Sequence, residues 1–345
     1  MSAIFINPSG QEDNLGDSVL RRKYLSVLRE SGELHVLVRG SRDYEAGLGL
    51  SANDVVYRSA RRWILMGLRS ALEGRASFAL NAGEIVLDRR YWFALCWQAL
   101  LALSARASGG TFVAAGISMR VNPGRAVLGL TALLKSADMV LWRDPTGVRD
   151  TGIGSVVPDW AFAEQSEGRT LQRRSSIVVS MRGDRPAPPS EWLEAIRGQA
   201  VRNGWVIVVV VQVIRDSERA HEMAAKLQAE VLDWSGGSHR EHEALVREAY
   251  ASAVGVISDR IHCLILGACE GAIPIGCAPG SSEKIDRTFR AITRTPVSYT
   301  MDYFTNVPDS LERAVQKGQK VLEDVATARS VVESASFELG VTLAR

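Results

Sequence analysis

The sequence predicts an α/β protein with two doubly wound, Rossmann-like domains, an interdomain cleft and a long C-terminal helix. First, short apolar runs alternate with segments of helical spacing, a pattern typical of parallel sheets covered on both faces. Second, 345 residues are enough for two cores of ordinary size. Third, the polar stretch Glu164–Arg174 interrupts the pattern and predicts a linker. We therefore expect domains at residues 1–165 and 175–345.

The N-terminal series begins with Ala3–Asn7, an apolar run expected to be a strand. Asp17–Gly32 is expected to be a helix, because its apolar residues recur at helical spacing. Further strands are expected at Leu34–Val38, Val55–Ser59, Ser77–Leu80, Thr111–Gly116 and Met139–Arg143. Further helices are expected at Arg62–Leu72, Tyr91–Ala107 and Pro123–Ser136.

The C-terminal series contains a strongly apolar strand, Trp205–Val213, and ends in a long helix, Pro308–Ser336, expected to pack back on the domain. Other strands are expected at Ser176–Met181, Gly255–Ser258 and Ile273–Cys277. Other helices are expected at Pro189–Asn203, Asp216–Glu230, His242–Ala253 and Arg260–Glu270. Because doubly wound sheets bind ligands outside the carboxyl ends of their strands, we search for chemistry there.

Composition excludes several classes of protein. Disorder and coiled coil do not fit 46% hydrophobic and 23% charged residues, and 41 basic against 39 acidic residues do not favour nucleic acid as a partner. The N-terminus does not resemble a signal peptide, and no apolar run reaches the about 18–20 residues of a membrane span, so we expect a cytoplasmic protein. The cysteines are interpreted as buried thiols in a reducing compartment: Cys96, Cys263, Cys269 and Cys277.

Tyr91–Leu103 is a strongly apolar and aromatic run, preceded by Arg89 and Arg90. We interpret it as a buried helix of the N-terminal sheet domain. Contact with the inner face of a membrane is the alternative, because Trp and Arg suit an interface.

The segment Ile257–Gly276 carries the clearest chemical signal. A strand ends at Ser258–Asp259, and Arg260 and His262 are expected in the first turn of the helix that follows. A helix N-terminus and an arginine suit a phosphate or carboxylate, and histidine is the side chain whose ordinary pKa lies nearest neutrality. As the alternative, Arg260 pairs with a local carboxylate and His262 is a half-buried histidine.

Other cations follow strand ends in the same way. Arg143 and Arg182 each follow a strand directly, and Lys284 ends a Gly- and Ser-rich loop after Ile273–Cys277. Each is a candidate for an anion, with salt bridges or a solvated lysine as alternatives.

Three glycine-bearing turns are candidates for close backbone approach to a ligand: Asn14–Asp17, in which Asp17 is expected to be an N-cap or to accept from a sugar hydroxyl, and the turns at Gly83 and Gly116. Serine-hydrolase, zinc-protease, P-loop and dinucleotide motifs are missing. His239 and His242 have no partner set for a metal and are interpreted as a solvated loop and helix start, so no metal is expected.

In order and spacing, these segments resemble the polysaccharide pyruvyl transferase family from about Ile4 to Lys284. The most specific mark is S-x-R-x-H-x-x-x-x-x-A at residues 258–268. The sequence departs from the family pattern at Asn81-Ala82-Gly83, which lacks a doubled glycine, and at Gly116-Ile117-Ser118. The other matching segments are Asn14–Ser18, Asn81–Asp88, Val113–Ile117, Arg143 with Asp144 and Thr146, Pro158–Phe162, Ser180–Arg182, Gln212 with Asp216, and Lys284.

The resemblance implies a fold of the two-domain GT-B type and transfer of a pyruvyl group from phosphoenolpyruvate to hydroxyls of a sugar in a cell-surface polysaccharide or its lipid-linked precursor, with a ketal as product. It implies no cofactor beyond this donor substrate. We expect catalysis by His262, Lys284 and Arg260, with His262 as acid–base group. The donor is expected at Arg143, Arg182, Arg260, Ile261, His262 and Lys284. The acceptor is expected on the N-terminal domain at Asn14, Gly16, Asp17, Gly83 and Gly116.

The main alternative is a nucleotide-sugar glycosyltransferase of the same architecture, with Glu270, Glu283 or Asp286 on the ribose. A catalytically inactive scaffold of a polymer-assembly complex is the second, disfavoured because the cationic and acid–base positions are all present. An NAD-dependent oxidoreductase is a distant third, because the dinucleotide loop is absent. The sequence predicts no oligomeric state.

Overall fold

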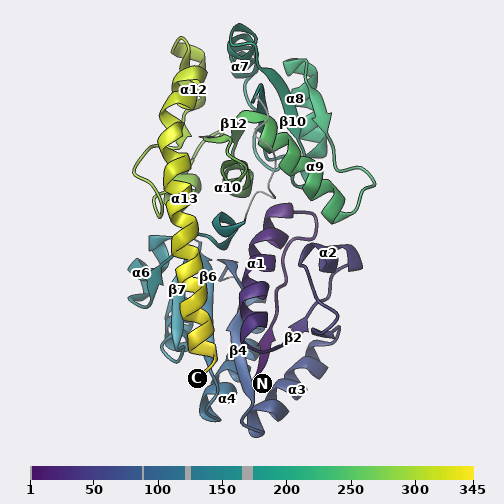
Figure 1. Ribbon diagram of the computed structural model, residues 1–345, viewed down its shortest axis with the longest axis vertical. Coiled ribbons are helices and arrows are strands. Elements are labelled where there is room, and N and C mark those ends of the chain that lie inside the picture. The colour runs from purple at the N-terminus through teal and green to yellow at the C-terminus, as the bar shows by residue number, and fades with distance from the viewer. Residues whose placement is uncertain (1, 88, 121–125, 165–173) are drawn as a thin grey trace. The chain divides into compact units, whose positions relative to one another are not determined.

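The computed structural model describes residues 2–87, 89–120, 126–164 and 174–345 (Figure 1). The chain divides into two compact units, each with its own parallel sheet. The first contains residues 1–12, 17–160 and 330–345, and the second contains residues 13–16 and 161–329. Three expected features lie partly outside the described residues. They are the linker Glu164–Arg174, the segment Asn81–Asp88 at its last residue, and the helix expected from Pro123 at its start.

The first unit is built on an eight-stranded parallel sheet, in the order β3-β2-β1-β4-β6-β7-β8 with β5 beside β6. β1, β4 and β6 are buried along their whole length, which explains their continuous apolar runs. The strands are β1 (Ala3–Ile6), β2 (Glu33–Leu37), β3 (Val55–Tyr57), β4 (Ala76–Leu80), β5 (Gly83–Ile85), β6 (Phe112–Met119), β7 (Met139–Trp142) and β8 (Ser155–Val156).

Two of the expected glycine turns are instead parts of strands. Gly83 begins β5, and Gly116 lies inside β6 at an irregularity between Ala115 and Ile117. Gly116 has a φ of 71°, so the strand passes through a conformation that favours glycine without ending there. A glycine in an apolar run can mark a bulge as well as a turn, which is why the sequence predicted the wrong element.

The helices of the first unit were mostly expected, apart from the short α2 and α6. α1 begins at Leu15, so Asp17 lies inside the first turn and is not the predicted N-cap. The helices are α1 (Leu15–Ser31), α2 (Arg42–Gly47), α3 (Ala60–Leu72), α4 (Arg89–Ala107), α5 (Ala126–Leu134) and α6 (Pro145–Thr151), followed by the short 3-10 helix η1 (Trp160–Ala163).

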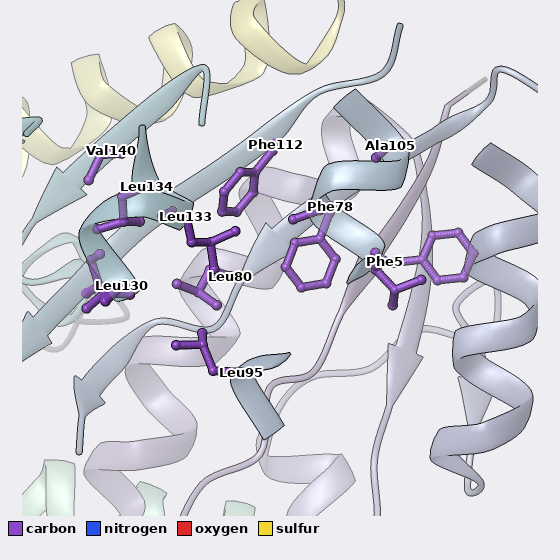
Figure 2. Packing of buried hydrophobic residues seen from close by; sticks show 14 of the residues in the cluster. Phe5, Phe78, Leu80, Leu95, Ala105, Phe112, Leu130, Leu133, Leu134 and Val140 are labelled. Atoms are coloured by element: carbon purple, nitrogen blue, oxygen red, sulfur yellow. The ribbon is translucent and has the colours of Figure 1, made fainter. Parts of the chain in front are cut away.

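One face of this sheet packs against α3, α4 and α5 (Figure 2). Phe5, Phe78 and Phe112 project from three neighbouring strands into this core, and Leu95 of α4 and Leu130 of α5 belong to the same cluster. Because side chains alternate along a strand, Ile4 and Ile6 are directed to the opposite face of the sheet. The expected helix at Tyr91–Ala107 is buried on the side that faces the sheet, where Leu95, Leu101 and Ala105 join this core.

The second unit is built on a six-stranded parallel sheet in the order β11-β10-β9-β12-β13-β14. The short β11 and β14 were not predicted, and the buried strand at Trp205–Val213 is shorter than expected. The strands are β9 (Ser176–Ser180), β10 (Val206–Val210), β11 (Glu230–Leu232), β12 (Ala253–Ser258), β13 (Ile273–Cys277) and β14 (Ser298–Tyr299).

The expected α/β class is confirmed: two doubly wound parallel sheets and a long C-terminal helix, α13 (Ser310–Leu343). Residues 310–329 of α13 belong to the second unit, and residues 330–343 belong to the first. The remaining elements are α7 (Ser190–Arg202), η2 (Ile214–Asp216), α8 (Ser217–Leu227), α9 (His239–Ser252), α10 (Ile261–Cys269), α11 (Glu283–Phe289) and α12 (Met301–Asn306).

Candidate active site

Three strands of the second sheet end beside one another at a cluster of charged residues. β9, β10 and β12 are neighbours and run in the same direction. Their carboxyl ends therefore meet at one edge of the sheet, where doubly wound folds place their ligands. The segments after these ends carry three arginines and three aspartates, called here the strand-end cluster: Arg182, Asp184, Arg185, Asp216, Asp259 and Arg260.

Arg260 is held by Asp216 in a buried ion pair. Its Nε and Nη2 both donate to the Asp216 carboxylate, and the two side chains are 8% and 3% exposed. Asp216 also accepts from the backbone N–H of Gly183 at 2.7 Å. Arg260 is the N-cap residue of α10, one position before the expected first turn. The local carboxylate that the sequence left open as a partner is therefore present, and the pair as a unit is neutral.

Arg182 forms a second pair that faces solvent. Its guanidinium donates to Asp184 through Nε at 2.8 Å and Nη2 at 2.6 Å, and Asp184 is about half exposed. These hydrogen bonds lower the pKa of Asp184 to about 2. The Arg182 backbone N–H donates to Asp259, whose Oδ2 lies 3.5 Å from Arg185 Nη1. Burial raises the pKa of Asp259 despite these cationic neighbours.

His262 and Gly16 approach so closely that Gly16 has no room for a side chain. A Cβ added to Gly16 would lie 2.3–2.5 Å from Cβ, Nδ1 and Cγ of His262, which is half-buried in the first turn of α10. Asn14 shapes this approach, because its Oδ1 accepts from the Gly16 N–H at 3.1 Å. The Leu15 N–H donates to the carbonyl of Gln212 at 3.2 Å. Asn14 and Gly16, expected at the acceptor, thus lie beside His262 in the second unit.

Ile261 and Lys284 lie in the first turns of two different helices. Ile261 begins α10 with its side chain buried, and Lys284 is the half-buried second residue of α11. Lys284 was expected at the end of a loop, but the segment after Ser282 is helical. β13, which precedes α11, is next to β12, which precedes α10. The sheet order therefore places Lys284 one strand away from Arg260.

Arg143 belongs to the first unit and forms a buried pair with Asp159. Its Nη1 donates to Asp159 Oδ2 at 2.8 Å. Burial alone would lower the pKa of Arg143, but the charge and hydrogen bond of Asp159, together with the charges of Glu84 and Asp144, outweigh it and the pKa is raised. The next residue, Trp160, stacks on Tyr24 with ring centroids 5.6 Å apart. A Cβ on Gly116 would lie 2.0 Å from Trp160 Cδ1, so this packing also requires glycine.

Arg21 collects the other residues expected at the acceptor. It pairs with Asp17 at 3.3 Å, and its Nε donates to Asn81 Oδ1 at 3.2 Å. A Cβ on Gly83 would lie 3.0 Å from Arg21 Nη2. Gly83 pairs with Ile117 in the sheet, and Gly116 directly precedes Ile117 in β6. Asp17, Gly83 and Gly116 are thus neighbours in the first unit.

The comparison with known families decides the assignment. The sequence profile of the polysaccharide pyruvyl transferase family matches residues 14–280. The chain belongs to this family. It is therefore an enzyme of this kind, a transferase of polysaccharide biosynthesis, and the resemblance inferred from the motifs is confirmed. No curated protein is significantly similar in sequence.

Solved structures confirm the GT-B type of fold for this pyruvyl transferase family member. UDP-GlcNAc 2-epimerase from Neisseria meningitidis bound to UDP-GlcNAc aligns with a TM-score of 0.61 at 8% identity, over 98% of this chain and 100% of that one. MnaA of S. aureus with UDP aligns with a TM-score of 0.58 at 10% identity, over 98% and 97%. A glycosyltransferase from Rickettsia africae aligns with a TM-score of 0.55 at 12% identity, over 98% and 97%. At such identities the likeness shows the fold alone.

Several residues of the site were not singled out from the sequence as ligands or partners. Asp216 and Asp159 neutralise arginines expected to bind the donor, and Arg21 organises the residues expected at the acceptor. Asp216 was noted only as part of a motif. The sequence signal that could have found Asp216 is its position after the end of β10, which matches the position of Arg182 after β9. Arg21 gives no such signal, since it lies within a helix among other charged residues.

Among the residues that the structure describes, no group of three or more His, Cys, Asp and Glu side chains is arranged to hold a metal ion, and no helix is long and apolar enough to cross a membrane.

One of the four cysteines differs from expectation. Cys96 is exposed, because it lies on the outward side of α4, whereas Cys263, Cys269 and Cys277 are buried as predicted. Burial raises the pKa of Cys269 and of Cys277 to about 12.

His239 and His242 are buried, and their interpretation as a solvated segment was wrong. Both belong to the first turn of α9, and the ring of His242 stacks on Trp234 at a centroid distance of 4.9 Å. His242 Nε2 donates to the carbonyl of Val211 at 2.7 Å. A capping box at Ser238 begins the helix three residues earlier than expected, and both imidazoles are buried.

Acidification is expected to destabilise the second unit through His242. Burial lowers its folded pKa below the ordinary value of 6.5, so the unfolded chain binds more protons when the pH falls below that value. The stabilisation is complete above pH 6.5 and is lost as pH falls toward the folded pKa, with a slope of at most about 1.4 kcal/mol per pH unit. Urea unfolding between about pH 8 and 5 measures this. The His242→Gln variant should show a flatter profile, and an identical profile would contradict the assignment.

Proposed function

We propose that this protein transfers the pyruvyl group of phosphoenolpyruvate to two hydroxyls of a sugar, in a cell-surface polysaccharide or its lipid-linked precursor, and forms a pyruvate ketal. Family membership supports the transferase class. The observation that carries the donor assignment is the position of His262 in the first turn of α10, against Gly16 and beside the strand-end cluster. This position brings a proton-transfer group to an edge of the sheet that carries three arginines.

The anionic donor needs cations that can change partners. The Arg260–Asp216 pair is buried and neutral, so Arg260 serves mainly to hold the start of α10 in place. Arg182 is better suited to exchange, because Asp184 is half exposed and can move into water when a phosphate or carboxylate replaces it. Arg185 lies in the same cluster, and the N–H groups of the first turn of α10 favour a negative charge.

The reaction requires two proton movements that a histidine performs well. In the proposed sequence, His262 delivers a proton to the methylene carbon of phosphoenolpyruvate, a sugar hydroxyl adds to C2, and the proton that this hydroxyl loses returns to His262. The C–O bond to phosphate then breaks, and the second hydroxyl closes the ketal. The proton from this hydroxyl leaves with the phosphate as hydrogen phosphate, so atoms and charge balance. Lys284 is proposed to stabilise the leaving phosphate.

The acceptor is proposed to bind in the first unit, near Asp17, Gly83 and Gly116. Arg21 and Asn81 supply side chains that can exchange hydrogen bonds with sugar hydroxyls, and the two glycines let backbone approach closely. Arg143 lies in the same unit, and it must leave its buried pair with Asp159 before it can bind the anionic donor.

Calorimetric titration with phosphoenolpyruvate, in parallel with UDP-glucose, tests the donor. We expect saturable binding of phosphoenolpyruvate and no binding of UDP-glucose. His262→Gln should keep the dissociation constant for phosphoenolpyruvate within about threefold, because the imidazole acts on the methylene carbon and not on the anionic groups. In a phosphate-release assay with a panel of sugar diols, the same variant should lower kcat by about 10²–10⁴-fold.

His221→Gln is the matched control for His262→Gln. His221 lies in α8 of the same unit, is exposed, and pairs with Asp233 at 3.1 Å. Its replacement should leave phosphate release unchanged. Binding of UDP-glucose without binding of phosphoenolpyruvate would overturn the proposal and favour the nucleotide-sugar glycosyltransferase, the alternative suggested by the solved structures with UDP and UDP-GlcNAc.

A further inference from the structure

Two neighbouring helices of the first unit carry large apolar side chains on their outward faces. α3 and α4 pack against each other so closely that a Cβ on Gly67 would lie 2.7 Å from Leu101 Cδ2. Both helices cover the same face of the sheet, through Trp63 and Leu101 among others. The outward residues, called here the α3–α4 surface, are Leu65, Leu72, Trp97, Leu100 and Leu103.

The spacing of these residues makes the α3–α4 surface continuous along each helix. Leu65 and Leu72 are seven positions apart, and Trp97, Leu100 and Leu103 follow one another at intervals of three. The exposure is large, at 90% for Leu72 and 57% for Trp97. Isolated exposed leucines need no explanation, but a row on each of two adjoining helices marks a surface that contacts another phase or molecule.

The two helices that form this surface carry charge of a single sign. α3 and α4 contain six arginines, with no lysine and no carboxylate between Ala60 and Leu72 or between Arg89 and Ala107. Two carboxylates from outside the helices reach these arginines: Glu73 pairs with Arg69, and Asp138 pairs with Arg106. A partner of matching chemistry is therefore apolar at its centre and anionic around it.

We propose that the α3–α4 surface binds the headgroup region of a membrane rich in anionic phospholipids. Tryptophan and leucine enter the boundary between headgroups and acyl chains, and arginines meet the phosphates above it. Arg61 and Arg62 are exposed at the start of α3 and supply charge for this contact. The surface lies on the face of a folded sheet domain, so the helices lie along the membrane and do not cross it.

A second copy of the chain fits this surface less well. A symmetric dimer would set the patch against itself, because both partners of an isologous interface use the same residues. The exposed Arg61 and Arg62 of each copy would then meet the same positive surface, with no carboxylate from either pair of helices. An anionic lipid surface offers the opposite charge, so the arginines favour it.

Flotation of the full chain with vesicles tests the proposal. We expect binding to phosphatidylcholine vesicles that contain about 30% phosphatidylglycerol, weaker binding to pure phosphatidylcholine, and release at high salt. The variant Leu72→Gln/Trp97→Gln should lower the partition coefficient by about tenfold or more. Arg61→Gln/Arg62→Gln should reduce the preference for phosphatidylglycerol.

The matched control is Val201→Gln/Phe337→Gln, which replaces two exposed apolar residues of α7 and α13. Its partition coefficient should stay within about twofold of the unmodified protein. Thermal unfolding of each variant verifies that it is folded. Absence of binding to phosphatidylglycerol vesicles, or equal loss in the control, would overturn the proposal. A dimer that dissociates only in Leu72→Gln/Trp97→Gln, without vesicle binding, would also overturn it in favour of a second copy.

Discussion

Gly16→Ala is expected to abolish most of the pyruvyl transfer activity, with a fall in kcat of about a hundredfold or more. The added methyl group would lie 2.3 Å from Cβ of His262, and that atom cannot rotate away because it is fixed to the backbone of α10. Either α10 or the start of α1 must shift. A displacement of about 1 Å at a group that transfers a proton is sufficient for such a loss.

Stability should decrease in the same variant, although alanine is the better helix former. Glycine to alanine inside a helix ordinarily stabilises by about 0.5–1 kcal/mol. Here overpacking opposes that gain with about 1–3 kcal/mol, so the net change is destabilising. Phosphate release and urea unfolding measure the two effects.

Gly198→Ala in α7 is the control for Gly16→Ala. Its Cβ would meet only Arg202 Nη1, at 3.6 Å, which is ordinary contact with a flexible side chain. This variant should keep full activity and the same or slightly higher stability. Full activity in Gly16→Ala would contradict the close approach of Gly16 to His262 and remove its role in the proposed mechanism.

Most of the fold could be predicted from the sequence because its signals are local. The strands at Ala3–Ile6 and Ser176–Ser180 lie within continuous apolar runs, and the long helix α13 has sustained helical spacing. The short elements α2, β11 and β14 were missed, because segments of two to six residues carry too little periodicity. Gly83 and Gly116 were assigned to turns because a glycine that begins a strand or lies in a bulge gives the same sequence signal as a glycine in a turn.

The candidate site was predictable only in part, because its contacts join distant segments. Arg260 and His262 are recognised by their place at a helix start, which spacing reveals. The carboxylate that neutralises Arg260 lies 44 positions earlier in the chain, and no local pattern links the two. The contact of Gly16 with His262 spans a still longer separation. A search after the carboxyl ends of the strands thus finds the cations in the sequence. Only the folded structure shows which of these cations form ion pairs with carboxylates.

Asp216→Ala is expected to lower the free energy of unfolding by about 3–5 kcal/mol, the largest stability effect predicted for the site. The substitution leaves the guanidinium of Arg260 buried without its bidentate partner, and the Gly183 N–H loses the acceptor at 2.7 Å. A buried arginine keeps its charge at any accessible pH, so protonation changes cannot relieve the cost. Urea unfolding measures the loss, and the start of α10 should become more susceptible to proteolysis.

The comparison with Asp184→Ala shows how much of the loss in free energy of unfolding comes from the burial of the ion pair and how much from the loss of the carboxylate charge. Both substitutions remove a carboxylate that binds an arginine of the same cluster through two hydrogen bonds, but Asp184 is about half exposed and Asp216 is 3% exposed. Water replaces the lost partner of Arg182, so Asp184→Ala should cost no more than about 1 kcal/mol. Asp216→Ala/Arg260→Met should regain much of the loss of the single variant, because it removes the uncompensated charge. Equal costs for the two alanine variants would mean that the Arg260–Asp216 pair is solvated, and Arg260 would then be as free as Arg182 to bind the donor.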